Sequence, residues 1–596
     1  MRYSKVKVFV LIITLVMGNY FCAQIGMGQW RMHVASGQAI DLAVVNNTVF
    51  TAFENGIHVY NSESEEEELL TDINGLSDIN VSCIYYDDIS DAVLVGYENG
   101  NIDKITNDNI YNIPAIKLAE VPNSKRINRF VRSGDFVYVA TDFCIVKLDL
   151  IKDEVKDTFY PTNGNEALID LSFSQDTIFA LTPSMLKFGL LSNPALPDNS
   201  QWQVDTRLPV LTEHSYSEIE PFQGKQFVLF KQEQYGKDSV FFLTSGGQSL
   251  LTESPFSLEI NSMNILNDTS FAVNLDGGIF IYGESLENPQ SYTSSNMFIW
   301  ISPLRTARNE QGIWSADKTK GLFLFPSGIA YKRHPIIGPY NNDFYSMDWQ
   351  NEKLAIASGR LSGKLPSFST NGIHLFENEE WTFHNKNNVE PWQNLNIWDF
   401  IDIAVNPTNT DQFAVASYSE EPLSIFNNDS VTLFNNTNST LEYTEIGNGW
   451  ALASSVTYDP NGNLWVLNGY TEKPLNVMDA DGLWMNFDCG VDARNIYTTK
   501  LIADFNDHLW FASENNGLFG YNYNATLTNP DDDSYIQLST GINSGNLPSK
   551  NVTAIAADFD GEIWIGTDAG FAILYNATNA FNSSPGEYDA QRIKVT

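Results

Sequence analysis

The chain has 596 residues and carries 34 Lys and Arg against 73 Asp and Glu, a net charge of −39. Aromatic residues make up 13% and charged residues only 18%, so the chain has the material for a core that a disordered acidic chain lacks. The negative net charge argues against a protein that binds nucleic acid by neutralising its phosphates. Four cysteines are too few for a small scaffold held together by disulfides.

The first residues have the pattern of a secretory signal peptide. Three basic residues within the first seven precede the apolar run 8–17, which is too short to span a bilayer. We predict a signal peptide over 1–23 with cleavage after Ala23; acylation of Cys22, as in a lipoprotein, is the alternative. No later run has the length of a membrane span, so we expect an exported protein with no direct membrane span that associates with the cell surface or outer membrane after periplasmic transit.

A strand-turn-strand unit recurs through the first half of the chain. Its clearest copies are TVFTAFENGIHVY, AVLVGYENGNIDKI and FVYVATDFCIVKL, in which β-branched and aromatic residues alternate with polar ones. The central apolar residues of seven copies are Phe50, Leu94, Tyr138, Phe179, Phe227, Phe271 and Trp314, at intervals of 41 to 48 residues. This period is typical of a four-stranded propeller blade, and seven copies predict one closed wheel.

The second half repeats less regularly, with five further markers. These are Leu354, Phe413, Trp465, Trp510 and Trp564, the last three following an acidic turn. The fold is therefore expected to be all-β, with tandem β-propellers: a seven-bladed one over 24–335, and a second over 336–596, also expected to be seven-bladed but incomplete, with about five blades present. Residues 29–34 (QWRMHV) resemble a spare strand that closes a ring.

The segments that open the first wheel resemble the PorZ family, two-propeller surface proteins of the type IX secretion system in Bacteroidota. The resemblance is carried by GQWRMHVASGQAIDLAVVNNTVFTAFENGIHVY, GLSDINVSCIYYD, LVGYENGNIDKI and KRINRFVRSGDFVYVATDFCIVKLDLIKDEVKDTFY. It is densest over residues 29–160, whereas the IWIGTDAG-type segments near residue 564 are shared by many extracytoplasmic propellers.

The resemblance implies a non-enzymatic component of the surface attachment complex that delivers anionic lipopolysaccharide to a sortase. The implied partners are that sortase, its outer-membrane barrel components, and anionic lipopolysaccharide or another glycan; the family also ends in a β-sandwich sorting domain that this sequence does not contain.

Motifs of catalysis and metal binding are not found in the sequence. It has no His-Glu-x-x-His pair, no Gly-x-Ser-x-Gly elbow and no phosphate-binding Gly-rich loop. The acidic turns at 504–507 and 558–561 could be read as calcium loops, but hairpin turns that use Asp and Gly explain them better. We therefore expect no catalytic residues, no metal and no cofactor.

Two stretches are candidates for ligand binding. Trp381, Trp392 and Trp398 lie in an Asn-rich segment, and flat aromatic faces with amide groups suit a saccharide groove; packing between blades is the alternative, and Trp392, beside Pro391, is the one we expect least in the core. In KRINRFVR, strand alternation would place Arg126 and Arg132 on one face, as a basic patch for an anionic glycan; a solvated strand edge is the alternative.

Two other functions stay open at this point. One is the extracytoplasmic sensor propeller of a hybrid two-component regulator, suggested by the IWIGTDAG segment. The other is a propeller-fold polysaccharide lyase or glycosidase, for which the sequence offers no assignable cluster of catalytic side chains.

Overall fold

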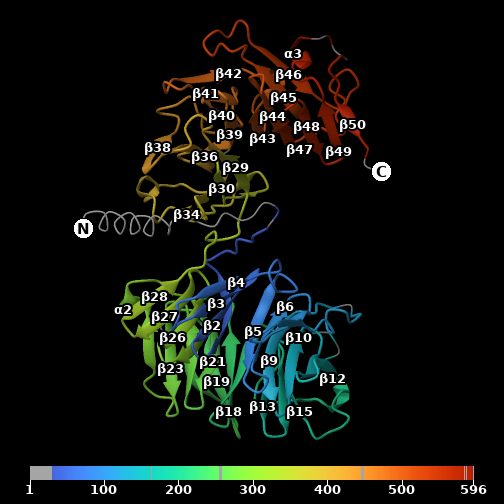
Figure 1. The fold of residues 1–596 in the computed structure, drawn as a ribbon, viewed down its shortest axis with the longest axis vertical. Helices are drawn as coiled ribbons and strands as arrows, with labels where there is room; N and C mark the ends of the chain where they lie inside the picture. Colours follow the sequence, from blue (N-terminus) through green and yellow to red (C-terminus); the bar gives the residue numbers. More distant parts are fainter. Residues whose placement is uncertain are drawn as a thin grey trace, which may run out of the picture. The chain divides into compact units, whose positions relative to one another are not determined.

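The computed structural model describes residues 28–594 except 29, 122, 163, 165, 254–257, 445–448, 583 and 585–586. It divides the chain into two compact units, Met1–Asn341 and Asn342–Thr596, each built almost wholly of antiparallel strands (Figure 1). The predicted signal peptide lies outside the described residues. The predicted domain bounds, 24–335 and 336–596, stay a prediction; residues 336–341 fall within the first unit.

The described part of the first unit forms seven four-stranded sheets, in each of which consecutive strands pair. The strands, grouped by sheet, are β1 (Ala39–Val45), β2 (Thr48–Phe53), β3 (Gly56–Asn61), β4 (Glu67–Leu70); β5 (Val81–Asp87), β6 (Ala92–Tyr97), β7 (Ile102–Ile105), β8 (Ile110–Asn112); β9 (Ile127–Ser133), β10 (Phe136–Thr141), β11 (Ile145–Asp149), β12 (Glu154–Phe159); β13 (Asp170–Ser174), β14 (Thr177–Leu181), β15 (Leu186–Leu190), β16 (Gln203–Val204); β17 (Ser215–Phe222), β18 (Lys225–Lys231), β19 (Ser239–Thr244), β20 (Gly247–Glu253); β21 (Ile260–Asn267), β22 (Ser270–Leu275), β23 (Gly278–Gly283), β24 (Gln290–Thr293); and β25 (Pro303–Asn309), β26 (Gly312–Asp317), β27 (Gly321–Ser327), β28 (Ala330–His334). A short helix, α2 (Ser294–Met297), and a 3-10 turn, η1 (Asn199–Gln201), lie between strands.

The second unit has five groups of four strands within its described residues, and the second and third groups join into one eight-stranded sheet because Tyr418 and Ser419 pair with Leu452 and Ala451. They are β29 (Ser346–Gln350), β30 (Lys353–Ala357), β33 (Ile373–Glu377), β34 (Glu380–His384); β35 (Phe400–Val405), β36 (Gln412–Ser419), β37 (Leu423–Asn427), β38 (Ser430–Phe434); β39 (Ala451–Tyr458), β40 (Leu464–Gly469), β41 (Leu475–Met478), β42 (Trp484–Phe487); β43 (Thr498–Ala503), β44 (His508–Ser513), β45 (Gly517–Asn522), β46 (Ser534–Leu538); and β47 (Val552–Ala557), β48 (Ile563–Thr567), β49 (Gly570–Leu574), β50 (Gln591–Ile593). A separate hairpin, β31 (Leu361–Ser362) and β32 (Leu365–Pro366), is inserted between β30 and β33. The short turns are η3 (Glu390–Trp392), η4 (Val491–Ala493) and α3 (Asn579–Asn582).

The first strands of the sheets lie together at the centre of each unit. In the first unit they contact one another in the order β1, β5, β9, β13, β17, β21 and β25, and β25 contacts β1, which closes the ring. In the second unit β29, β35, β39, β43 and β47 contact one another in that order.

The spare strand predicted at residues 29–34 is not formed. Residues 30–36 have no strand; instead, the Ser36 and Gly37 amides donate to the carbonyls of Pro339 (2.7 Å) and Tyr340 (3.0 Å). Val34 packs with Ala316 and Ile336 at the seam between the first and last sheets. The ring therefore closes by side-chain packing and contact between β1 and β25, without a strand shared between sheets.

Candidate functional site

A cavity of about 330 Å³ lies at the centre of the first unit and is lined by residues of all seven first strands. Its charged groups pair with one another. The Arg129 guanidinium contacts Glu220 and lies 3.6 Å from Asp170, and the Arg305 Nε lies 3.3 Å from Asp41. Each arginine is thus already matched by carboxylates.

The same carboxylates join neighbouring sheets. Asp41 accepts the Ile84 amide (3.0 Å), and Asp170 accepts the Ile219 amide (2.8 Å). Burial raises the pKa of Asp170 to about 6 and that of Glu218 to about 7, although Arg129 and Arg305 oppose this rise. These groups bind one another and the backbone of neighbouring sheets, so we assign the central cavity a structural role.

The prediction that KRINRFVR forms one basic patch, with Arg126 and Arg132 on the same face of a strand, is wrong. A β-bulge follows Ile127, so that Ile127 pairs with Thr141 but Arg129 pairs with the adjacent Ala140. The Arg132 guanidinium is paired through two nitrogens with Asp87, whose side chain is fully buried, whereas Arg126 contacts the exposed Glu98. Because its guanidinium is already paired with a buried carboxylate, Arg132 is not available to bind a glycan, and we assign it a structural role.

The three candidate tryptophans lie in three different environments. Trp392 is fully buried: its ring stacks on Phe400 with centroids 4.4 Å apart, and its Nε1 donates to the Ser424 Oγ at 3.0 Å. The expectation that Trp392 lies outside the core is therefore wrong. Pro391 is the second residue of a 3-10 turn that begins at Glu390, and this turn places the Trp392 indole in the core instead of in a surface loop.

Trp381 and Trp398 are half-buried. Trp381, on β34, contacts Phe376 with ring centroids 4.9 Å apart. Trp398 instead packs edge-to-face against Phe368 (5.1 Å) and Trp450 (5.2 Å). The structure does not bring the three predicted tryptophans together, but it gathers Trp398 with two aromatic residues that sequence reasoning missed. Both come from other segments of the chain, and the only signal was their aromatic character.

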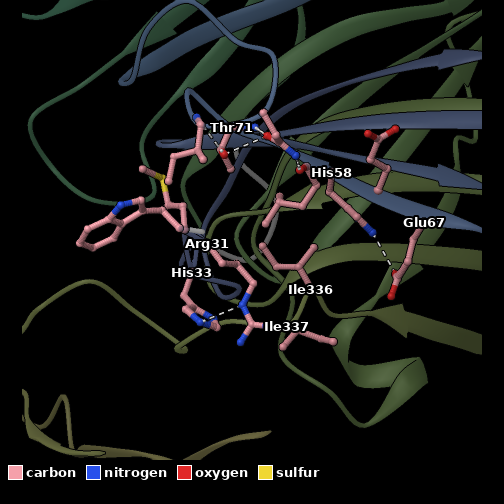
Figure 2. A pocket seen from close by; sticks show the side chains of 13 residues that line it. Arg31, His33, His58, Glu67, Thr71, Ile336 and Ile337 are labelled. Carbon is pink, nitrogen blue, oxygen red and sulfur yellow. Dashed lines mark hydrogen bonds and ion pairs between the residues drawn. The ribbon is translucent and has the colours of Figure 1, made fainter. Parts of the chain in front are cut away.

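A groove of about 320 Å³ lies at the seam of the first ring, between the N-terminal residues and Ile336 and Ile337 (Figure 2). The buried His58 lines the groove, and its Nε2 lies 3.1 Å from the Glu67 carboxylate. Burial lowers the pKa of His58, so the imidazole is neutral at pH 7 despite that carboxylate. Glu67 and Glu68 line the groove, which makes it a poor place for an anionic saccharide.

Metal-binding geometry and long apolar helices are not found among the described residues. No group of three or more His, Cys, Asp or Glu side chains there is placed to hold a metal ion, and no helix there combines the length and hydropathy of a bilayer span. Cys83, Cys144 and Cys489 are buried free thiols.

Comparisons with known proteins find similarity to PorZ in part of the sequence and in the fold. Residues 49–203 match the family model of the PorZ N-terminal β-propeller domain of the type IX secretion system, and residues 546–569 match a two-component regulator propeller model. A search of curated proteins found no match.

The fold is similar to that of PorZ from Porphyromonas gingivalis, described as an essential bacterial surface component of the type IX secretion system. The TM-score is 0.78 at 22% sequence identity, over 95% of this chain and 75% of that one. The extracellular domain of a protein assigned to a hybrid two-component system of B. thetaiotaomicron covers 94% of this chain and 77% of its own, at 12% identity and a TM-score of only 0.38. The all-β tandem-propeller fold and the resemblance to PorZ are thus confirmed.

Proposed function

We propose that this PorZ-like chain is a surface component of a type IX secretion system. The observation that carries the proposal is the match of residues 49–203 to the PorZ N-terminal propeller model, supported by the similarity of the whole fold to PorZ. In this role the chain works at the cell surface with the sortase and the outer-membrane barrel components.

The finer part of the proposal is that the chain binds anionic lipopolysaccharide and presents it to the sortase without catalysing a reaction. Propeller rings suit such a task because their sheets form rigid supports for loops at both ends. The two arginines of the central cavity are each shared among several carboxylates, and these carboxylates tie neighbouring sheets together, which fits a scaffold better than a reaction centre.

Affinity purification of the full chain from outer membranes tests this role. A tagged chain should co-purify with the sortase and at least one barrel component, together with anionic lipopolysaccharide, and an unrelated tagged surface propeller serves as the control. Recovery of none of these partners above the control would contradict the proposal.

A second candidate is a sensor of the two-component type, favoured by the match at residues 546–569. The two functions differ in the effect of gene deletion. Loss of a sensor changes the transcription of the genes that it regulates and leaves secreted cargo normal, whereas loss of a secretion component changes the cargo.

A further inference from the structure

The second unit has an inserted hairpin that sets its first sheet apart. The connection between β30 and β33 runs over residues 358–372 and contains β31 and β32, whereas the equivalent connections in the other sheets are 420–422, 470–474, 514–516 and 568–569. The hairpin tip reaches the fourth sheet: the Lys364 Nζ lies 2.7 Å from the Glu514 carboxylate and 5.4 Å from the centre of the Tyr497 ring. Leu361 packs against Ile401 and Leu452 on the way. The hairpin therefore lies across the ends of the first strands.

Aromatic residues gather beneath and beside this hairpin. Trp398, Trp450 and Tyr497 each come just before a first strand, β35, β39 and β43 respectively. Because these strands lie side by side, the residues that precede them meet at one end of the unit. The contacts agree: the ring centroids of Trp398 and Trp450 are 5.2 Å apart, and Trp450 and Tyr497 pack against the same buried residues as Tyr470, whose ring centroid lies 5.9 Å from that of Tyr497. We call Phe368, Trp398, Trp450, Tyr470 and Tyr497 the aromatic cluster.

The backbone of Phe368 has an unfavourable conformation that hydrogen bonds from its neighbours stabilise. Its φ of 60° is in the left-handed region, which is unfavourable for a bulky side chain. The buried Asp399 carboxylate stabilises this conformation by accepting the amides of Ser367 (2.9 Å), Phe368 (3.0 Å) and Ser369 (2.8 Å). As a result the Phe368 ring is 54% exposed over Trp398 and Trp450. Strain that is fixed in place by its surroundings is a common mark of a functional site.

One polar group in the cluster lacks a partner. The buried indole N–H of Trp398 has no hydrogen-bond acceptor among the described residues. Buried donors without a partner are rare in folded proteins, and each calls for an explanation. This donor lies in a ring that packs directly against Phe368 and Trp450, the residues that a ligand would touch first.

The hairpin also brings positive charge to a strongly acidic protein. Arg360 is exposed and has no ion pair among the described residues, and Lys364 is paired only with the half-exposed Glu514. Such a surface pair contributes little stability, so Lys364 can exchange Glu514 for a ligand acid group at small cost. Exposed aromatic faces with nearby cations suit sugar rings that carry carboxylate or phosphate groups.

We propose that the aromatic cluster, with Arg360 and Lys364, is a binding site for an anionic saccharide. The rings of the saccharide stack on Phe368 and Trp450, and its acid groups pair with the two cations of the hairpin. This inference rests on the proposed function and gives the glycan a place on the second unit.

The test measures binding of anionic lipopolysaccharide, purified from the producing bacterium, to the full chain. Phe368→Ala and Trp450→Ala should each weaken binding at least tenfold. Trp349→Ala is the matched control, because Trp349 is a 57% exposed tryptophan of the same unit on β29, and it should bind as the wild type does. Lys364→Gln should weaken binding at least threefold at 150 mM salt, with a smaller effect at 500 mM.

Two defined oligosaccharides test whether the site recognises acidic sugar rings in general or only the glycan of lipopolysaccharide. Tetragalacturonate carries carboxylates without a lipid, and maltotetraose is its neutral counterpart. Binding of tetragalacturonate but not maltotetraose supports recognition of acidic sugar rings in general, whereas binding of lipopolysaccharide alone supports recognition of its own glycan.

The proposal is overturned if Phe368→Ala and Trp450→Ala bind lipopolysaccharide as tightly as the wild type while keeping its circular dichroism spectrum. The proposed function would then survive with the glycan elsewhere. If the wild type binds no lipopolysaccharide, the glycan-delivery part of the proposed function fails as well. Should Trp450→Ala not fold, the exposed Phe368→Ala decides the question.

Discussion

At the scale of single residues, Arg126 and Arg132 show that the burial of the paired carboxylate determines whether an arginine is available to bind a ligand. Both belong to one basic run in the sequence, yet Arg132 is bound to the fully buried Asp87 and Arg126 to the exposed Glu98. The Arg132 guanidinium and Ser90 hold the pKa of Asp87 below its usual range, against the effect of burial. A sequence shows the charges but not the burial of their partners, so this difference could not be predicted from it.

Arg132→Met should therefore be strongly destabilising. It leaves the Asp87 carboxylate buried without its cation, and we expect a loss of about 3 kcal/mol in the free energy of unfolding. Arg126→Met, the control, removes only an exposed ion pair and should cost less than about 1 kcal/mol. Urea unfolding of both variants checks this, and equal losses would contradict the assignment.

Glu218 gives the first unit a pH-dependent stability of defined sign. Burial raises its pKa to about 7 from an ordinary value near 4.5, so the folded state binds a proton that the unfolded state releases in this window. The contribution of the protonated Glu218 to the free energy of unfolding is complete below pH 4.5 and is lost as the pH rises through 7. Buried His334, with its pKa lowered to about 4, acts in the opposite direction, so a variant comparison is needed to isolate Glu218.

Glu218→Gln should remove this dependence while keeping an acceptor for the Met263 amide. Between pH 5 and pH 8 the free energy of unfolding of the variant should rise by up to about 3 kcal/mol relative to that of the wild type. Thermal unfolding at a series of pH values measures the difference. If the difference between variant and wild type stays constant with pH, Glu218 is ionised throughout and the interpretation is wrong.

At the scale of secondary-structure elements, the repeated acidic turn shows what sequence patterns can predict. In all three copies one Asp accepts two backbone amides and a tryptophan Nε1: Asp459 with Trp465, Asp504 with Trp510, and Asp558 with Trp564. The carboxylates are thus occupied by N–H donors, as expected of structural turns. The repeat markers were equally informative, because every one from Phe50 to Trp564 lies in the second strand of its sheet.

The features that sequence reasoning missed depend on long-range packing. The bulge in β9 reverses the face of Arg129, and a similar register shift occurs in β1 between Ala39 and Asp41, without a distinctive local sequence. Trp392 is drawn into the core because two neighbouring sheets leave room for it. The aromatic cluster joins residues from β-strand ends and an inserted hairpin, which only the folded second unit brings together.

Asp504→Ala should destabilise the second unit more than Asp558→Ala. Trp510 is fully buried, so losing Asp504 leaves its indole N–H and two amides without their acceptor, and we expect a cost of about 3 kcal/mol. Trp564 is 41% exposed, so water can replace Asp558 and the cost should be about 1 kcal/mol. Chemical unfolding monitored by tryptophan fluorescence compares the two, and the reverse order would contradict this account.

At the scale of the whole molecule, the net charge of −39 opposes the approach of an anionic glycan. The hairpin cations act only at short range, whereas the field of the whole chain acts at distances comparable to the screening length of about 10 Å at 0.1 M salt. Recognition must therefore rely on local contacts that overcome a general repulsion.

The association rate constant for tetragalacturonate should consequently rise with ionic strength. Between 20 and 150 mM salt we expect an increase of about twofold or more, because salt screens the repulsion before it weakens the local pairs. Stopped-flow fluorescence measures this rate. A steep fall with salt would show that a strong basic surface attracts the glycan, which this account excludes for the described residues.

The central claim, that the chain delivers anionic lipopolysaccharide within a type IX secretion system, is tested most directly on the cargo. The measurement is the fraction of secreted cargo that carries lipopolysaccharide in a strain lacking this gene, with complementation by the wild-type chain. The account predicts cargo without the modification, restored on complementation. Cargo modified as fully as in the parent strain would contradict it.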